Sequence, residues 1–109
     1  MTELEISVET LAARRAAGEE LHLLDVREPW EFKLCRIEGS VNVPLGRLAD
    51  AIDPDTLNDG RPVIVICHHG FRSLRATLWL RGQGVADCLS LAGGVERWAN
   101  VVEPAMARY

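Results

Sequence analysis

The sequence predicts an α/β fold, with a mainly parallel sheet and helices on both of its faces. Stretches typical of strands alternate along the chain with stretches of helical periodicity. Residues 63–66 are four consecutive β-branched residues, which is typical of a central strand buried on both faces. The chain has 109 residues, of which 48% are apolar, so we expect one domain over residues 1–109 with a core of its own.

The first half of the chain is expected to supply three strands and three helices. A short edge strand at residues 5–6 precedes a helix that Ser7 caps and Gly18 stops. The apolar residues of this helix fall on one face, namely Val8, Leu11, Ala12 and Ala16. The next elements are a strand, a short helix and a strand, over residues 21–26, 29–34 and 41–43. A third helix is marked by the spacing of Leu45, Leu48 and Ile52 and is ended by Asp53-Pro54.

The second half begins with a turn over residues 58–60, which leads into the central strand. A helix over residues 74–81 follows, and its expected apolar face holds Leu74, Thr77 and Leu78. The later elements are a strand, a tight turn and a helix, over residues 85–91, 93–94 and 95–99. The tail from residue 100 shows no pattern beyond one last helical turn. We assign the three tryptophans to packing, namely Trp30, Trp79 and Trp98.

Composition and charge disfavour several classes of function. The formal net charge of −4 argues against nucleic acid or an anionic membrane as the partner. No apolar run approaches the roughly 20 residues of a membrane-spanning helix, and the acidic N-terminal stretch lacks the blocks of a signal peptide. The three cysteines show no CxxC spacing, which indicates neither a disulfide framework nor a zinc site. We therefore expect a cytoplasmic protein with reduced thiols.

Cys67 stands where the central strand ends and the next helix approaches. A free thiol with a pKa of about 8.5 is only a few per cent thiolate at neutral pH. The helix N-terminus, a nest of N–H groups in the turn at Gly70, and the charges of Arg72 and Arg75 all favour the thiolate. This arrangement points to a reactive cysteine. The alternative is a buried structural thiol, because free cysteine is often buried.

Other polar residues admit more than one role. Asp25 follows a second strand, so it shares an edge of a parallel sheet with Cys67. Asp25 is either a general base or, as we favour, a residue that ties down this edge through an arginine or backbone N–H groups. His68 and His69 point in different directions and lack a third ligand at metal spacing, so we expect no metal site and assign them to loop polarity or to a base role. The other two cysteines are assigned structural roles, namely Cys35 and Cys88.

Four segments, taken in order, resemble the signatures of the rhodanese homology domain, a sulfurtransferase module. Residues 25–32 resemble the pattern DVRxxxEF, and residues 37–45 resemble IxGAxxIP. Residues 67–73 match the active-site pattern CxxGxRS, and residues 91–98 resemble LxGGxxxW. The resemblance covers nearly the whole chain, with the four segments in the family's order. Arg36 departs from the family, because many members carry a histidine there.

The resemblance implies a five-stranded, mainly parallel sheet and a sulfurtransferase that needs no metal or organic cofactor. Cys67 is then the catalytic residue, which carries sulfur as a persulfide. The implied donor is a small anion such as thiosulfate, or a persulfide, and the implied acceptor is cyanide, a small thiol or a protein thiol. The implied substrate-binding residues are His68, His69, Gly70, Phe71 and Arg72, with Arg72 as the cationic partner of the donor. The implied supporting residues are Ser73, Asp25 and Arg27.

Loop length separates two chemistries. Arg72 comes five positions after Cys67, which gives a six-residue loop. Related phosphatases place five residues between cysteine and arginine, and their wider loop fits a phosphate. The shorter loop suits one sulfur atom on the cysteine, so we favour sulfur transfer over a phosphatase or an arsenate reductase. A further alternative is a non-catalytic module that uses this fold to bind a protein partner, which the intact cysteine disfavours.

Overall fold

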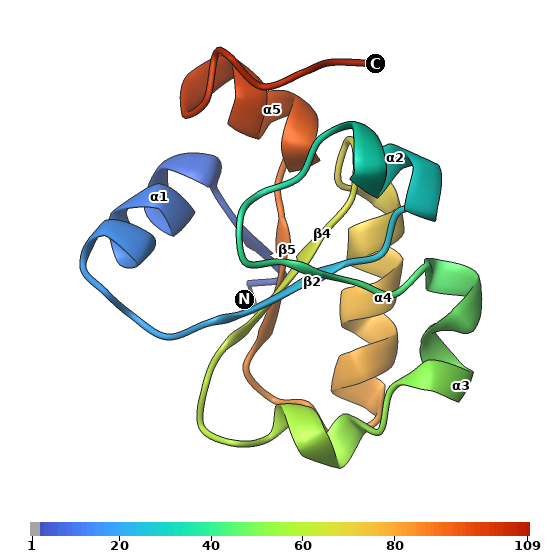
Figure 1. The fold of residues 1–109 in the computed structure, drawn as a ribbon. Helices are drawn as coiled ribbons and strands as arrows, with labels where there is room; N and C mark the ends of the chain where they lie inside the picture. The colour runs from blue at the N-terminus through green and yellow to red at the C-terminus, as the bar shows by residue number, and fades with distance from the viewer. Residues whose placement is uncertain (1–2) are drawn as a thin grey trace.

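The computed structural model describes residues 3–109 as a five-stranded sheet with helices on both faces, as the sequence predicts (Figure 1). Met1 and Thr2 of the acidic N-terminal stretch lie outside the described residues. The strands are β1 (Glu5–Ile6), β2 (His22–Asp25), β3 (Val41–Asn42), β4 (Val63–Ile66) and β5 (Cys88–Leu91). They lie in the order β1-β5-β4-β2-β3, and every neighbouring pair is parallel.

The helices alternate with the strands along the chain. They are α1 (Val8–Ala16), α2 (Pro29–Leu34), α3 (Leu48–Ala51), α4 (Phe71–Gly82) and α5 (Gly94–Val101), with short 3₁₀ helices η1 (Leu45–Arg47) and η2 (Pro54–Leu57). As predicted, Ser7 caps α1, because its Oγ accepts a hydrogen bond from the backbone N–H of Thr10 at 3.1 Å. Within residues 3–109, no helix has the length and apolar character needed to cross a membrane.

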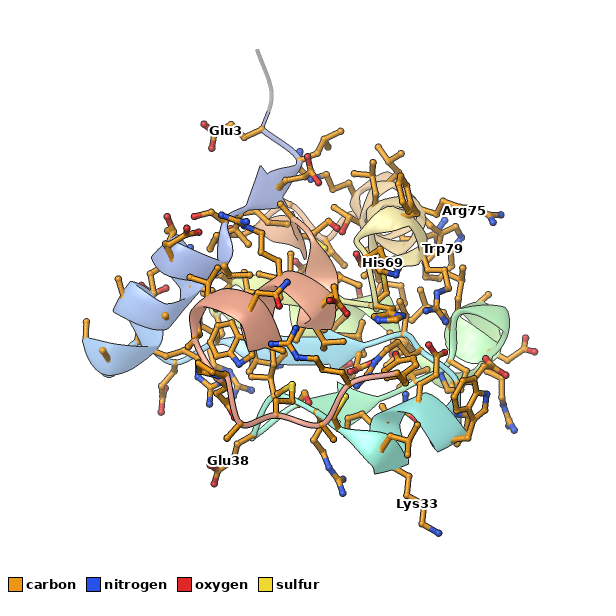
Figure 2. The ribbon with its side chains drawn as sticks, turned by 90° about the horizontal axis from the view of Figure 1, so that it is seen from above. Glu3, Lys33, Glu38, His69, Arg75 and Trp79 are labelled. Carbon is orange, nitrogen blue, oxygen red and sulfur yellow. The ribbon has the colours of Figure 1, made fainter. Side chains whose placement is uncertain are left out.

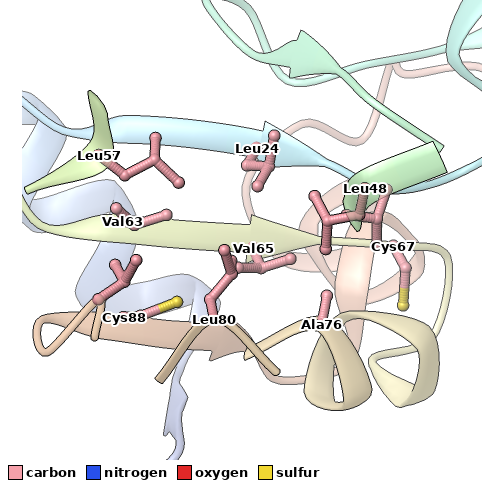
Figure 3. Close-up of a cluster of buried hydrophobic side chains, with 11 residues drawn as sticks. Leu24, Leu48, Leu57, Val63, Val65, Cys67, Ala76, Leu80 and Cys88 are labelled. Atoms are coloured by element: carbon pink, nitrogen blue, oxygen red, sulfur yellow. The ribbon is translucent and has the colours of Figure 1, made fainter. Parts of the chain in front are cut away.

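The core lies in two layers, one on each face of the sheet. Side chains of β4 alternate between them, with Val63 and Val65 in one layer and Ile64 and Ile66 in the other. The first layer packs against α3 and α4, and Figure 3 shows it with Cys67 at one end. The second layer packs against α1 and α5. All four β4 side chains are fully buried, which confirms that this strand is buried on both faces.

The boundaries of two elements differ from the prediction. Helix α4 begins at Phe71, three residues before Leu74, because Gly70 takes a left-handed φ of 105° and serves as the N-cap. Strand β5 begins at Cys88 rather than at Val85. The N–H of Val85 donates a hydrogen bond to the carbonyl oxygen of Leu80, so the backbone at Val85 caps the C-terminal end of α4 and does not join the sheet.

Two further predictions, on the inward face of α4 and on the three tryptophans, need adjustment. The buried face of α4 holds Ser73, Ala76, Thr77 and Leu80, whereas Leu78 is 52% exposed. Three of these four residues are small, which lets α4 lie directly against β5, and Leu80 fills the core beside them. Trp98 is buried and Trp79 packs against the core, but Trp30 is 60% exposed at the start of α2. On the same helix, Lys33 points away from the body of the protein (Figure 2).

Thr77 gives a test of this packing. Its Oγ1 is buried and makes no strong hydrogen bond within residues 3–109; the weak partner beside it is the thiol of Cys88, whose pKa burial raises to about 11. We expect Thr77→Val, which replaces the hydroxyl by a methyl group, to raise the free energy of unfolding by about 1 kcal/mol in urea titrations. Thr77→Ala is the control, because it leaves a cavity and should be less stable than the valine variant. A loss of stability in Thr77→Val would show that the hydroxyl has a partner.

Candidate active site

Cys67 follows β4 directly, and its thiol lies against the first turn of α4 (Figure 3). The residue is only 1% exposed. The backbone N–H of Gly70 donates a hydrogen bond to Cys67 Sγ at 3.0 Å, and Ser73 Oγ lies 3.3 Å from the same sulfur. A helix N-terminus and a backbone N–H both stabilise negative charge, so this position suits a thiolate or an anionic persulfide.

A pair of buried hydroxyl groups lies beneath the thiol. Ser73 Oγ donates to the carbonyl oxygen of Gly70 at 3.2 Å and lies 2.7 Å from Ser90 Oγ on β5. Both serines are fully buried. When Cys67 gives up its proton, the Ser73 hydroxyl can turn to donate to the sulfur while Ser90 remains its partner. The sequence analysis did not identify Ser90, although a serine between two leucines in a strand is a recognisable signal.

The start of α5 holds the Cys67 loop in place. The N–H groups of Val95 and Glu96 donate to the carbonyl oxygens of Cys67 and His68, at 2.9 and 3.1 Å. A Cβ atom on Gly94 would lie 2.3 Å from the carbonyl oxygen of Cys67, a distance that real contacts do not allow. The backbone of the loop and the backbone of α5 therefore meet at a place where only glycine fits.

Asp25 and Arg27 form a fully buried ion pair beside the loop. Asp25 is the last residue of β2 and pairs in register with Ile66, so the parallel sheet brings it next to Cys67. Its Oδ1 and Oδ2 accept hydrogen bonds from Arg27 Nε and Nη2 at 3.0 and 2.8 Å. Arg27 also donates to the carbonyl oxygen of Cys35 at 2.6 Å. Both carboxylate oxygens of Asp25 are thus engaged, which is the tying role rather than that of a free base.

Arg72 is held by a carboxylate that the sequence analysis did not single out. Its two terminal nitrogens donate to Oε1 and Oε2 of Glu31, on α2, at 2.5 and 2.9 Å. The Glu31 side chain is 5% exposed and also accepts hydrogen bonds from the N–H of Glu28 and from the Tyr109 hydroxyl. The bonds from Arg72 lower the pKa of Glu31 to about 2, so the carboxylate is ionised at neutral pH.

The remaining loop residues lie around the mouth of the site. The expectation that His68 and His69 point in different directions is wrong, because their rings stack with centroids 3.9 Å apart. His68 also stacks on Tyr109 at 4.0 Å, and Figure 2 labels His69 near the start of α4. Burial, together with the charge of His69, lowers the pKa of His68. Phe71 is 79% exposed. We call the mouth of the site the rim, and define it as residues 67–73 together with Asp25, Arg27, Glu31 and Tyr109.

Tyr109 is the third residue that sequence reasoning missed, after Ser90 and Glu31, because the tail has no periodic pattern. Its hydroxyl donates to Glu31 Oε2 at 2.8 Å and accepts from Arg27 Nη1 at 2.9 Å, so it links the two ion pairs. Burial raises the pKa of Tyr109 to about 12, which keeps the hydroxyl protonated. Residues 3–109 contain no group of three or more side chains that could hold a metal ion.

A sequence model of the family described as "Rhodanese-like domain" matches residues 7–101. The chain is 40% identical to "Thiosulfate sulfurtransferase GlpE" of Pseudomonas syringae, over 70% of each protein. It is 32% identical to the Bacillus subtilis protein YrkF, whose name describes a sulfur carrier protein, over 91% of this chain and 52% of YrkF. The chain thus spans about half of that relative, and 24% of the length of the Mycobacterium tuberculosis protein MoeZ.

Solved structures show the same fold. "Human Single Domain Sulfurtranferase TSTD1" superposes with a TM-score of 0.78 at 25% identity, over 92% of this chain and 98% of the human chain. A rhodanese-related protein of Thermoplasma volcanium superposes with a TM-score of 0.76 at 29% identity, over 93% and 95% of the two chains. Cys67, Asp25 and Gly94 all lie within residues 7–101, which the family model matches.

The contact of Gly94 with the loop predicts a large effect of a single methyl group. We expect Gly94→Ala to lower the free energy of unfolding by about 2 kcal/mol or more, because the new Cβ atom must push the Cys67 carbonyl away. Urea titration measures this. Gly82→Ala is the matched control, since no atom lies within 4 Å of its Cβ position and alanine favours helix. Full stability of Gly94→Ala would contradict the close approach.

The ion pair of Glu31 predicts a dependence of stability on pH. Because the bonds from Arg72 lower the pKa of Glu31 from 4.5 to about 2, the contribution of the ionised carboxylate to stability is complete above pH 4.5 and is lost as the pH falls toward 2. We expect the wild type to lose about 2 kcal/mol more than Glu31→Gln between pH 6 and pH 2.5. Urea titrations at both pH values test this, with Glu38→Gln at an exposed carboxylate as the control (Figure 2). Equal losses in the wild type and Glu31→Gln would mean that the pair does not stabilise the fold.

Proposed function

The chain belongs to the rhodanese-like domain family, and we propose that it is a sulfurtransferase that carries sulfur as a persulfide on Cys67. The observation that supports this most directly is the position of Cys67 Sγ, which lies 3.0 Å from the Gly70 N–H at the N-terminus of α4. The names of relatives such as the thiosulfate sulfurtransferase GlpE point to the same chemistry. The donor is thiosulfate or a persulfide, and the acceptor is cyanide or a thiol.

The first step loads the sulfur. The Cys67 thiolate attacks the outer sulfur of the donor, and the bond between that sulfur and the rest of the donor breaks. Thiosulfate releases sulfite, which leaves with the bonding electron pair, and Cys67 keeps one sulfur as an anionic persulfide. The Gly70 N–H and the Ser73 hydroxyl are placed to stabilise this negative charge.

The second step passes the sulfur on. An acceptor thiolate or cyanide attacks the outer sulfur of the Cys67 persulfide, the sulfur–sulfur bond breaks, and the Cys67 thiolate is restored. Because Cys67 is almost completely buried, only a slender group can reach the sulfur. No external oxidant or reductant takes part in either step.

The two rival functions make different demands on the loop. A phosphatase or arsenate reductase must hold a tetrahedral oxyanion above the cysteine, and the six-residue loop leaves less room for one than the longer phosphatase loop. A non-catalytic binding module has no use for the polar contacts around Sγ, which Gly70 and Ser73 provide.

We further propose that residues 1–109 act as one domain in the cytoplasm, where the three free cysteines stay reduced.

Mass spectrometry tests the proposal. After incubation with thiosulfate or glutathione persulfide, we expect the wild type to gain about 32 Da, the mass of one sulfur atom, and Cys67→Ser to gain nothing. Cys35→Ser is the matched control, because it removes another thiol near the rim and should keep the gain. Absence of any adduct on the wild type, or turnover of p-nitrophenyl phosphate in its place, would contradict sulfur transfer.

A further inference from the structure

We propose that the sulfur donor is an organic persulfide, RS–SH, rather than the thiosulfate dianion, and that the Glu31–Arg72 pair sets this preference. The inference rests on the proposed function and narrows its donor. It departs from the donor that the names of the GlpE relatives suggest. It rests on whether the positively charged side chains around Cys67 are free to bind an anion.

The arginine of the active-site loop is already occupied by a carboxylate. Arg72 gives both terminal nitrogens to Glu31, at 2.5 and 2.9 Å, which is the two-point geometry that arginine also uses for oxyanions. Glu31 is nearly buried and is held from two further sides by the Glu28 N–H and the Tyr109 hydroxyl. A dianionic donor would therefore have to displace a fixed, buried carboxylate in order to bind Arg72.

The other positive charges near the rim do not replace Arg72. Arg27 is fully buried and paired with Asp25. His68 has a lowered pKa because it is buried, so it is mostly neutral at pH 7. Arg75 lies one turn farther along α4, where it lines a separate cavity of about 380 Å³ together with Trp79. Figure 2 shows Arg75 extending outward on that side of the molecule.

The two donors make different demands on this site. Thiosulfate enters with two negative charges, and its leaving group, sulfite, also departs as a dianion. An organic persulfide RS–SH is attacked by the Cys67 thiolate at its outer sulfur. The new bond joins Cys67 Sγ to that sulfur, the RS–S bond breaks, and RS⁻ leaves with the electron pair while the proton stays on the transferred sulfur. In this reaction of the protonated donor, the attacking, transferred and leaving sulfur atoms together carry only one negative charge at any stage, so no free arginine is required at the reacting atoms.

Exposed aromatic groups favour a donor that contains carbon. Trp30 directly precedes Glu31, and Phe71 directly precedes Arg72, and both side chains are largely exposed. Trp30 also makes an edge contact with Tyr109, with ring centroids 5.7 Å apart. An organic group on the donor gains free energy by covering such apolar surface, whereas thiosulfate has nothing to place there.

The test compares donors by their kcat/KM for persulfide formation on Cys67, each divided by the rate constant of the same donor with free cysteine. Glutathione persulfide, methanethiosulfonate and thiosulfate form a series in which methanethiosulfonate carries one charge fewer than thiosulfate. We expect the wild type to react best with glutathione persulfide, then with methanethiosulfonate, and least with thiosulfate. A wild type that accelerates thiosulfate most would overturn the inference.

Variants then test the cause. In Glu31→Gln the amide cannot neutralise Arg72, so kcat/KM for thiosulfate should rise roughly tenfold to a hundredfold, while that for glutathione persulfide changes much less. The double variant Glu31→Gln/Arg72→Gln should lose the gain, and Glu38→Gln should behave as the wild type. An unchanged donor ratio in Glu31→Gln would overturn the role of this pair.

The wild-type measurements separate this inference from the proposed function. If no donor places sulfur on Cys67, both fail. If all three donors load Cys67 but thiosulfate is the best of them, sulfur transfer stands and the preference for an organic persulfide is wrong. If Glu31→Gln does not fold, the wild-type series across three donors still decides the matter.

Discussion

The position of the thiol depends on one close approach between backbones. The loop after β4 is fixed by the start of α5, where the N–H groups of Val95 and Glu96 bind its carbonyl oxygens and Gly94 leaves room for them. Gly70 completes the arrangement, because its left-handed φ lets α4 begin immediately and turns its own N–H toward Cys67 Sγ. Two helix starts thus meet at the end of the central strand, and the sheet supplies the rigid base from which they are placed.

The charged side chains around this loop form two ion pairs, which a neutral hydroxyl group links. Arg27 binds Asp25, Arg72 binds Glu31, and the Tyr109 hydroxyl bridges the two pairs. Breaking such a pair leaves an uncompensated charge and is destabilising, whereas apolar residues of the same volume could stabilise the fold as well, so what these pairs add beyond stability is a fixed geometry. Here they hold α2 and the tail against the loop, and they leave the rim close to electrically neutral.

Much of this could be predicted from the sequence. The buried strand, the cysteine at its end and the shared edge with Asp25 follow from local patterns and from parallel topology. The ion pair of Glu31 with Arg72 could not be predicted, because the two residues are 41 positions apart. A local sequence pattern does not indicate which arginine binds which carboxylate. The role of Tyr109 was equally hidden, since it comes from a tail without periodicity and acts only through tertiary packing. The inward face of α4 includes Thr77 as predicted, but it is completed by Ser73, Ala76 and Leu80 rather than by Leu74 and Leu78, because small residues at three of these four positions let the helix lie close to β5.

The ion pairs on the rim and the backbone N–H groups beneath it act on charges at different places. The field of a helix N-terminus falls off within its first turn, so α4 and the Gly70 N–H stabilise a charge on Sγ or on a sulfur bonded to it. They do little for a charge several ångströms farther out, where Arg72 would act if Glu31 did not hold it. Stabilising the persulfide and attracting the donor are therefore separate properties of this fold. A single carboxylate on α2 can change the second property while the first stays with the backbone.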